Sequence, residues 1–276
     1  MAERRHTSST GMKAVSLRSS AALSHRSPLR YPGGKTRAVK HILKFIPESI
    51  DCMVSPFVGG GSIELALANN GIRVYGYDAF SPLVEFWQCL LQDADSLANR
   101  VSQYLPLPKD HFYKLQKTQG ELPTKLERAA AFYVLNRASF SGSTLSGGMS
   151  PGHPRFTESS VDRLREFSNP HISVDRMDFH DSMAARSNIF AYLDPPYMIS
   201  SSLYGNGGDT HRGFDHEGLH TILKDRKSWI LSYNSCDSIR ALYSDFRQAL
   251  PSWTYGMGKD KTSKEVLIFS QDLEIY

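Results

Sequence analysis

The sequence predicts an α/β protein built on a doubly wound sheet, and three observations along its 276 residues support this. Short apolar runs typical of buried parallel strands occur at residues 50–54, 74–77 and 189–193. Segments with the helical spacing of apolar residues alternate with such runs. A glycine-rich loop follows the first run, and Asp78 ends the second. This order of strand, glycine loop, helix, strand and acid is the opening of a nucleotide-binding sheet.

The elements follow this rhythm on both sides of an interruption. A helical pattern at 39–46 stops at Pro47, because proline cannot continue a helix. The other elements expected in the first part are a strand at 50–54, a glycine loop at 57–62, a helix at 63–69, a strand at 74–77 and a helix at 81–91. Those expected in the second part are strands at 171–174, 190–193, 229–232 and 266–269, the last closing the sheet, and helices at 217–223 and 239–246.

The interruption spans residues 92–172 and indicates an inserted module. It holds two helical patterns, at 94–105 and 125–135, and then a stretch rich in Ser and Gly at 139–154. We therefore expect one main domain, formed by residues 27–91 and 173–276, with a mainly helical insert at 92–172.

Composition limits the classes to which the protein can belong. Apolar residues make up 40% and charged residues 22%, as in a soluble globular protein. No apolar run approaches the ~18 residues that span a bilayer, so we expect no membrane association. Three widely spaced cysteines and histidines without partner spacing predict a reducing, cytoplasmic compartment and no metal site.

Residues 1–26 form a basic tail that we expect to be disordered. They contain five of the 32 basic residues and one of the 28 acidic residues, which leaves 27 of each in the rest of the chain. The tail is rich in Ser, Thr and Ala and has almost no periodic apolar positions. Its composition is also that of a mitochondrial transit peptide, but we favour a solvated tail or a start at Met12. Any binding of a polyanion must then come from a local patch and this tail.

The glycine loop and Asp78 predict a nucleoside ligand. Glycines let backbone approach a ligand closely, and Asp78 ends the second strand, where a carboxylate accepts hydrogen bonds from ribose hydroxyls. The alternative for Asp78 is a helix cap or turn. The chain contains neither G-x-G-x-x-G nor a P-loop. A short glycine loop with a ribose acid therefore suits a ligand such as S-adenosylmethionine.

The most informative four residues are Asp194-Pro195-Pro196-Tyr197, after the apolar run 189–193. Asp194 and the Pro195 carbonyl can accept the two hydrogen bonds of an exocyclic amino group. Pro196 stiffens the backbone, and Tyr197 offers a stacking face. The alternative is an ordinary polar turn.

Taken together, these motifs resemble the Dam-like, alpha-group DNA adenine-N6 methyltransferases. The motifs run from Tyr31-Pro-Gly-Gly-Lys35 through Pro56-Phe-Val-Gly-Gly-Gly61-Ser62, Asp78 and Asp178-Phe179 to Asp194-Pro-Pro-Tyr197, and the resemblance covers roughly residues 27–275. It implies a Rossmann-like, S-adenosylmethionine-dependent methyltransferase sheet as the catalytic domain. The insert would then be a DNA target recognition domain.

The resemblance implies a role for each matching residue. Tyr31 would pack on the cofactor, Lys35 would pair with its carboxylate, and Asp78 would bind its ribose. The loop residues Pro56, Phe57 and Gly59 would surround the methionine part, and Asp178 and Phe179 would bind the cofactor's adenine, although Phe179 could equally be plain core. The tetrapeptide Asp194, Pro195, Pro196 and Tyr197 would grip the target adenine.

The sequence departs from this pattern in two places. Ser55 stands where the family usually has Glu. The segment from Asn136 to Gly142 is similar to the family's N-R-x-x-[FY]-N-G, but the residues after it differ, so GATC specificity is not carried over. Arg137 is the leading candidate for a DNA contact, with Ser139 and Ser141 as lesser ones. The alternative for Arg137 is an ion pair with a local carboxylate.

These inferences predict a monomeric enzyme that transfers a methyl group from S-adenosylmethionine to the N6-amino group of a flipped adenine in double-stranded DNA. A separately acting restriction endonuclease is a possible partner. Transfer to cytosine N4 or to an amino group of RNA stays open. So does a DNA-binding module that keeps the fold without catalysis.

Overall fold

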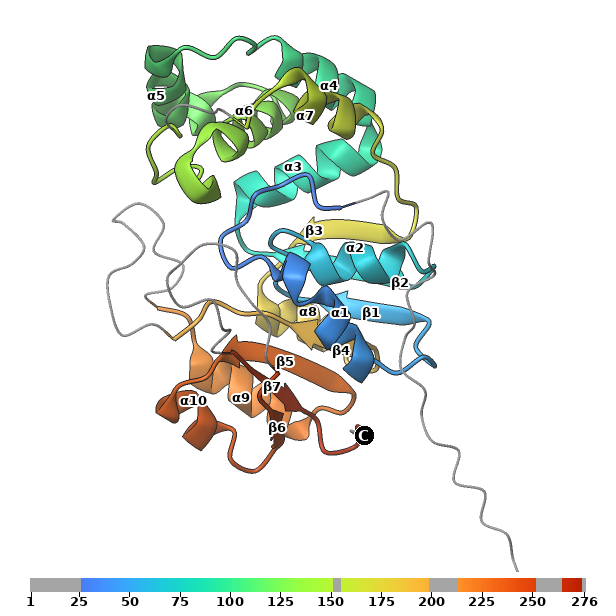
Figure 1. The fold of residues 1–276 in the computed structure, drawn as a ribbon. Helices are drawn as coiled ribbons and strands as arrows, with labels where there is room; N and C mark the ends of the chain where they lie inside the picture. Colours follow the sequence, from blue (N-terminus) through green and yellow to red (C-terminus); the bar gives the residue numbers. More distant parts are fainter. Residues whose placement is uncertain (1–25, 151–154, 199–212, 252–264, 275–276) are drawn as a thin grey trace, which may run out of the picture.

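The computed structural model describes residues 26–150, 155–198, 213–251 and 265–274 (Figure 1). The predicted basic tail, apart from Arg26, lies outside the described residues, as does the end of the Ser/Gly-rich stretch.

In the described part of the chain, seven strands form one sheet in the order β3-β2-β1-β4-β5-β7-β6. The five strands from β3 to β5 are parallel, whereas β7 is antiparallel to both of its neighbours. The strands are β1 (Cys52–Ser55), β2 (Arg73–Asp78), β3 (Ile172–Arg176), β4 (Phe190–Leu193), β5 (Trp229–Asn234), β6 (Arg247–Ala249) and β7 (Glu265–Phe269). This confirms the predicted α/β class and the expected strands.

One expectation about the sheet is wrong: the strand at 266–269 does not close it. β7 lies between β5 and β6, and β6 is the edge strand on this side of the sheet. The sequence of β6, Arg-Gln-Ala, has neither an apolar run nor alternation, so no local pattern marks it as a strand. Backbone pairing with β7 alone defines it.

Residues of each central strand alternate between the two faces of the sheet. On one face, Met53 and Tyr192 join the core beneath α1 (Val39–Ile42), α2 (Ser62–Ala68) and α3 (Ser81–Gln92). On the other, Val54 and Leu193 join a second core beneath α8 (Phe179–Ala185), α9 (His216–Asp225) and α10 (Asp237–Leu242). Both faces of the sheet are therefore covered, which explains why the central strands β4 and β5 are buried almost throughout rather than alternating.

Between α3 and β3 the chain forms the helices α4 (Ala94–Ser102), α5 (Lys109–Thr118), α6 (Lys125–Ala138) and α7 (Glu158–Arg165). Figure 1 shows them together at the end of the molecule opposite β6 and β7. The sequence predicted α4 and α6 but missed α5 and α7, because each buries only two apolar residues among charged ones, Phe112 and Leu115 in α5 and Val161 and Leu164 in α7. The domain boundaries at 92 and 172 stay a prediction.

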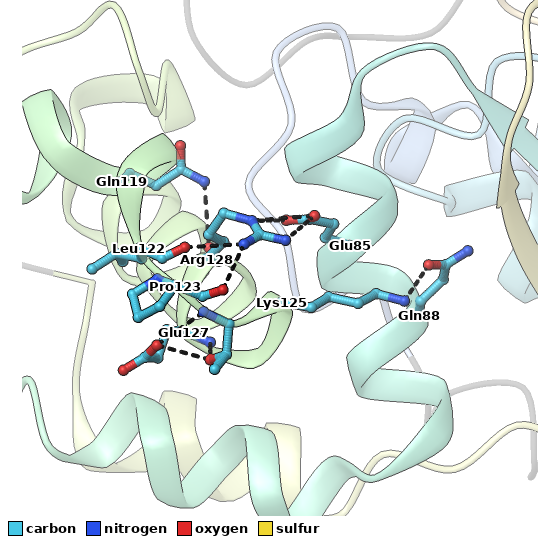
Figure 2. A network of polar contacts seen from close by, with 9 residues as sticks. Glu85, Gln88, Gln119, Leu122, Pro123, Lys125, Glu127 and Arg128 are labelled. Atoms are coloured by element: carbon cyan, nitrogen blue, oxygen red, sulfur yellow. Dashed lines mark hydrogen bonds and ion pairs between the residues drawn. The ribbon is translucent and has the colours of Figure 1, made fainter.

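Polar contacts join α6 to α3 (Figure 2). Arg128 donates to both carboxylate oxygens of Glu85, from Nη2 at 2.6 Å and from Nε at 2.9 Å, and its Nη1 donates to the Leu122 carbonyl. Lys125, the first residue of α6, donates to Gln88 on α3. Apolar residues of α3 and α6 belong to the same core cluster as those of β1 and β2. The helices α4 to α7 are thus packed against the sheet through α3. No helix among the described residues is long and apolar enough to cross a membrane.

Candidate active site and nucleic-acid surface

The candidate site lies where the carboxyl ends of β1, β2 and β4 meet. β2 and β4 flank β1, so the strand order reverses between β1 and β4. Such a reversal leaves a crevice beside the strand ends, which is the usual ligand site of a doubly wound sheet. Ser55 ends β1, Asp78 ends β2, and Asp194 follows the last residue of β4. The topology therefore brings together three sequence motifs that are far apart along the chain.

The glycine loop after β1 is fixed by contacts that leave no room for side chains. A Cβ on Gly60 would lie 2.7 Å from Cβ of Tyr31, and one on Gly61 would lie 2.9 Å from the ring of Trp87. Gly61 also has a φ of 68°, which glycine adopts without strain. The Trp87 indole donates to the Gly59 carbonyl at 3.0 Å. Tyr31 thus packs directly on the loop, and the first motif is part of the same site.

Asp78 holds the glycine loop to the end of β2. Its Oδ2 accepts from the Gly59 amide at 3.2 Å and its Oδ1 from the Phe80 amide at 3.0 Å. Burial raises the pKa of Asp78 to about 6, although these backbone hydrogen bonds oppose the rise. The carboxylate is therefore oriented toward the loop, and its role toward a ribose stays a prediction.

Asp178 and Phe179 follow β3, the neighbour of β2. Asp178 caps α8, because its side chain accepts from the Asp181 amide at 3.0 Å, and it remains half-exposed. Phe179 is buried, with its ring centroid 5.8 Å from that of Phe57 and 5.1 Å from that of Phe214. An acid beside an aromatic cluster therefore lies at the carboxyl end of the sheet, next to Asp78.

Asp194, which is partly exposed, forms an ion pair with the buried Lys35. The Lys35 Nζ lies 2.8 Å from Asp194 Oδ1 and 2.6 Å from the Tyr197 hydroxyl, and the lysine is 4% exposed. It also lies 3.4 Å from Oε1 of Glu265, the first residue of β7. Burial raises the pKa of Asp194, while the Lys35 ammonium lowers it. The structure thus places Lys35 on the tetrapeptide, and its expected contact with a cofactor carboxylate stays a prediction.

Pro195 is buried, whereas Pro196 and Tyr197 are partly exposed. The Tyr197 ring lies 6.1 Å from the Tyr233 ring, and the Lys35 ammonium lies 4.9 Å from the Tyr197 ring centroid. Aromatic and cationic neighbours therefore hold the tyrosine ring beside Asp194.

Ser55, the departure from the family pattern, binds a buried acid that sequence reasoning missed. Its hydroxyl donates to Glu64 Oε1 at 2.6 Å, and both side chains are buried. Burial raises the pKa of Glu64 to about 7. Sequence reasoning missed two acids, Glu64 and Glu265, and a signal exists for each. Glu64 is an acid in the first turn after the glycine loop, and Glu265 is an acid at the start of an apolar strand.

A buried asparagine joins the loop before Lys35 to the end of α6. The Asn136 side chain accepts from the Arg30 amide at 2.8 Å and donates to the Arg30 carbonyl at 2.9 Å. It also donates to the Thr144 hydroxyl at 3.1 Å. Gly142 fits against the same loop, since a Cβ there would lie 2.0 Å from the Arg30 carbonyl oxygen. The segment after α6 is therefore fixed relative to the active-site loop.

The three candidate DNA contacts differ in their surroundings. Arg137 is partly exposed and donates to the carbonyls of Arg155 and Pro28, at 3.2 Å and 3.5 Å. Ser139 is fully buried, and its hydroxyl bonds within the segment, donating to the Asn136 carbonyl. The expectation that Ser139 contacts DNA is corrected accordingly, because a side chain without exposed surface cannot reach a ligand. Ser141 is partly exposed and has a φ of 54°.

Four arginines, Arg30, Arg137, Arg155 and Arg163, form what we call the arginine patch. None of them forms an ion pair with a carboxylate of the described residues. Burial lowers the pKa of Arg137, and repulsion from the other three adds to this. The expected alternative for Arg137, an ion pair with a local carboxylate, is absent from the described residues. Beside the patch, Phe140 is 62% exposed, the most exposed aromatic ring identified in the described chain.

Among the described residues, no three His, Cys, Asp or Glu side chains are grouped closely enough to hold a metal ion.

Known proteins are similar to this chain over the residues that carry these motifs. A family model described as D12 class N6 adenine-specific DNA methyltransferase matches residues 31–257. Type II methyltransferase M1.LlaDCHI of Lactococcus lactis subsp. cremoris is 24% identical, over 79% of this chain and 84% of that protein. DNA N-6-adenine-methyltransferase of Escherichia phage P1 is 31% identical, over 82% of this chain but 32% of the phage protein. DNA adenine methylase of Haemophilus influenzae is 25% identical, over 63% of this chain and 65% of that protein.

Proposed function

The chain belongs to the D12 class of N6 adenine-specific DNA methyltransferases, and from this premise we propose which residues carry the reaction. Asp194, the Pro195 carbonyl and Tyr197 hold a flipped target adenine, and the crevice beside β1 and β2 holds S-adenosylmethionine. The observation that carries the proposal is the Asp194 carboxylate, which already accepts a hydrogen bond from an N–H group, that of Lys35, at the strand-order reversal of the sheet.

The crevice residues suit the methyl donor that this family implies. Tyr31 and Trp87 hold the glycine loop at the end of β1, and Asp78 lies at the end of β2 for hydroxyl groups. Asp178 and the ring of Phe179 stand at the next strand end, where an adenine ring with its amino group would find an acceptor and a packing face. When bound, the donor supplies a methyl group on a positively charged sulfur.

Asp194 and the Pro195 carbonyl would act on the acceptor nitrogen. The lone pair of adenine N6 is delocalised into the ring, which makes the amino group a poor nucleophile. Hydrogen bonds from both of its protons to these oxygens favour a more tetrahedral nitrogen and direct its lone pair toward the methyl group. A carboxylate has about four lone-pair sites, so Asp194 can accept from N6 while it remains paired with Lys35. The Asp194 carboxylate can also accept the proton that N6 loses.

The arginine patch and Phe140 support a DNA surface next to this site. Four guanidinium groups without acidic partners suit the phosphates of a duplex. Flipping a base costs a few kcal/mol, and stacking on an aromatic ring such as Tyr197 would return ~1–3 kcal/mol. Asn136 connects the patch to the loop that carries Lys35, so bound DNA would be placed relative to Asp194.

The test is methyl transfer from labelled S-adenosylmethionine to unmethylated duplex DNA, followed by nucleoside analysis. We expect the label in N6-methyladenine. Label in N4-methylcytosine or only in RNA would contradict the assignment of the acceptor. Donor binding without transfer would favour a DNA-binding module.

We further propose that the protein acts as a monomer and that its methylation protects DNA from a separately acting restriction endonuclease. The protective role is supported by relatives described as a type II methyltransferase and a modification methylase. Sequencing of methylated positions after expression in a methylation-free host would identify the site. Loss of cleavage by an endonuclease of the same specificity would then test protection.

A further inference from the structure

Glu265 is a buried acid that the proposed mechanism does not use. It is the first residue of β7, and its side chain is 3% exposed. Its Oε2 accepts from the Ser232 hydroxyl of β5 at 3.2 Å, whereas its Oε1 accepts no hydrogen bond from the described residues. Glutamate is almost never buried without a partner. The partner here is the Lys35 ammonium, 3.4 Å from Oε1.

Lys35 is therefore shared between two carboxylates. Its Nζ lies 2.8 Å from Asp194 Oδ1 and 3.4 Å from Glu265 Oε1, and it donates to the Tyr197 hydroxyl at 2.6 Å. With all three groups ionised, the cluster of Lys35, Asp194 and Glu265 carries one net negative charge. Without Glu265, the ammonium would pair with Asp194 alone and neutralise it more completely.

We propose that Glu265 is a positioning residue for methyl transfer: by sharing Lys35 it leaves the Asp194 carboxylate only partly neutralised by the ammonium and oriented to accept the target amino group. This inference rests on the proposed function of Asp194. Glu265 interacts with the Lys35 ammonium and with the Tyr197 hydroxyl, and it acts on Asp194 through these two side chains.

The electrostatic consequence has a definite sign. Burial raises the pKa of Glu265, and repulsion from the Asp194 carboxylate raises it further. Such a repulsion between two carboxylates acts on the pKa of each. Removing the Glu265 charge therefore lowers the pKa of Asp194. The ionisable groups that face the cluster from the elements around it are Lys35, Tyr31, Glu64, Tyr192, Tyr197 and Tyr233.

The experiment compares the full chain with Glu265→Gln, which keeps an acceptor for Ser232 but removes the charge. With both substrates saturating, kcat should fall at least ~10-fold, the size of a lost charged hydrogen-bond partner. The acid limb of the kcat–pH profile should move to lower pH. KM for the donor and for DNA should change far less than kcat. Glu265→Asp should return the acid limb toward its wild-type position, because it restores the charge.

Two outcomes overturn the proposal. One is an unchanged kcat in Glu265→Gln, and the other is a lower kcat with the acid limb unmoved, which is the signature of a purely structural role. Glu158→Gln, at an exposed acid on α7, is the matched control and should change neither quantity.

If Glu265→Gln does not fold, Ser232→Ala removes one anchor of the carboxylate and keeps its charge. That variant should lower kcat about 3-fold, within the range of a neutral hydrogen bond, and an unchanged kcat there overturns the proposal. A wild-type chain without adenine methylation would instead refute the proposed function.

Discussion

The two sides of the proposed site are held in different ways. On the sheet side, Asp78 ends one parallel strand and Asp194 follows another, and backbone amides or Lys35 fix their carboxylates. On the DNA side, the segment after α6 is irregular, and two non-glycine residues, Ser141 and Thr144, have positive φ values of 54° and 45°. Its place depends on contacts from Asn136, Arg30 and Gln116. The proposed catalytic residues are thus built on the sheet, and the proposed DNA surface is attached to it by a few polar contacts.

The largest expected effect tests the sheet side. Asp194→Ala should lower the rate of methyl transfer at least ~10³-fold, because both the acceptor for N6 and the partner of Lys35 are lost. Single-turnover transfer and donor binding by calorimetry would be measured together, and donor binding should persist. Asp110→Ala, an exposed acid on α5, is the control. A wild-type rate in Asp194→Ala would remove the basis of the mechanism.

The next effect concerns the link between the two sides. Asn136→Ala leaves the buried amide and carbonyl of Arg30 without partners, so the free energy of unfolding should fall by about 3 kcal/mol. Urea denaturation would measure this. Asn99→Ala, at an exposed position of α4, should change the free energy of unfolding by less than ~0.5 kcal/mol. Equal losses in the two variants would mean that Asn136 does not join the segments.

A pH-dependent effect separates the buried acid Glu64 from the exposed ones. The folded-state pKa of Glu64 is about 7 against an ordinary value of 4.5. The raised pKa means that the folded state binds the proton more tightly than the unfolded state does. The contribution of Glu64 to the free energy of unfolding is therefore favourable at low pH, and it is lost as pH rises from about 4.5 to about 7. Glu64→Gln should therefore gain stability relative to wild type over this window, approaching roughly 3 kcal/mol at pH 8. Denaturation of both proteins at pH 5 and pH 8 checks this, and a gap that does not widen with pH speaks against it.

The smallest expected effect tests the DNA side. Arg137→Gln should weaken DNA binding ~10-fold and lower the slope of log affinity against log salt concentration by about one. Fluorescence anisotropy across a salt series would measure both. Lys117→Gln, an exposed cation on α5, should leave the slope unchanged. An unaltered slope in Arg137→Gln would place the phosphate contacts elsewhere.

Sequence patterns predicted the elements that are defined locally. The apolar runs at 50–54 and 189–193 became β1 and β4, and the glycine loop and Asp78 occupy the expected strand ends. The helices α5, α7 and α8 were missed because their apolar positions are few and lie among charged residues. β6 was missed because only its pairing with β7 makes it a strand.

The sequence by itself determined the parts of the site whose chemistry is carried by neighbouring residues: the glycine loop, the acid at the end of β2 and the tetrapeptide from Asp194 to Tyr197. Local spacing is enough to predict these parts, because the strand, the turn and the proposed binding residues follow one another along the chain. Only the tertiary structure decided the partners. It brought Lys35 to Asp194 across 159 positions, placed Glu265 behind them, and buried Ser139 while leaving Arg137 partly exposed. Ion pairs and burial depend on which segments the sheet brings together, and no local pattern encodes this.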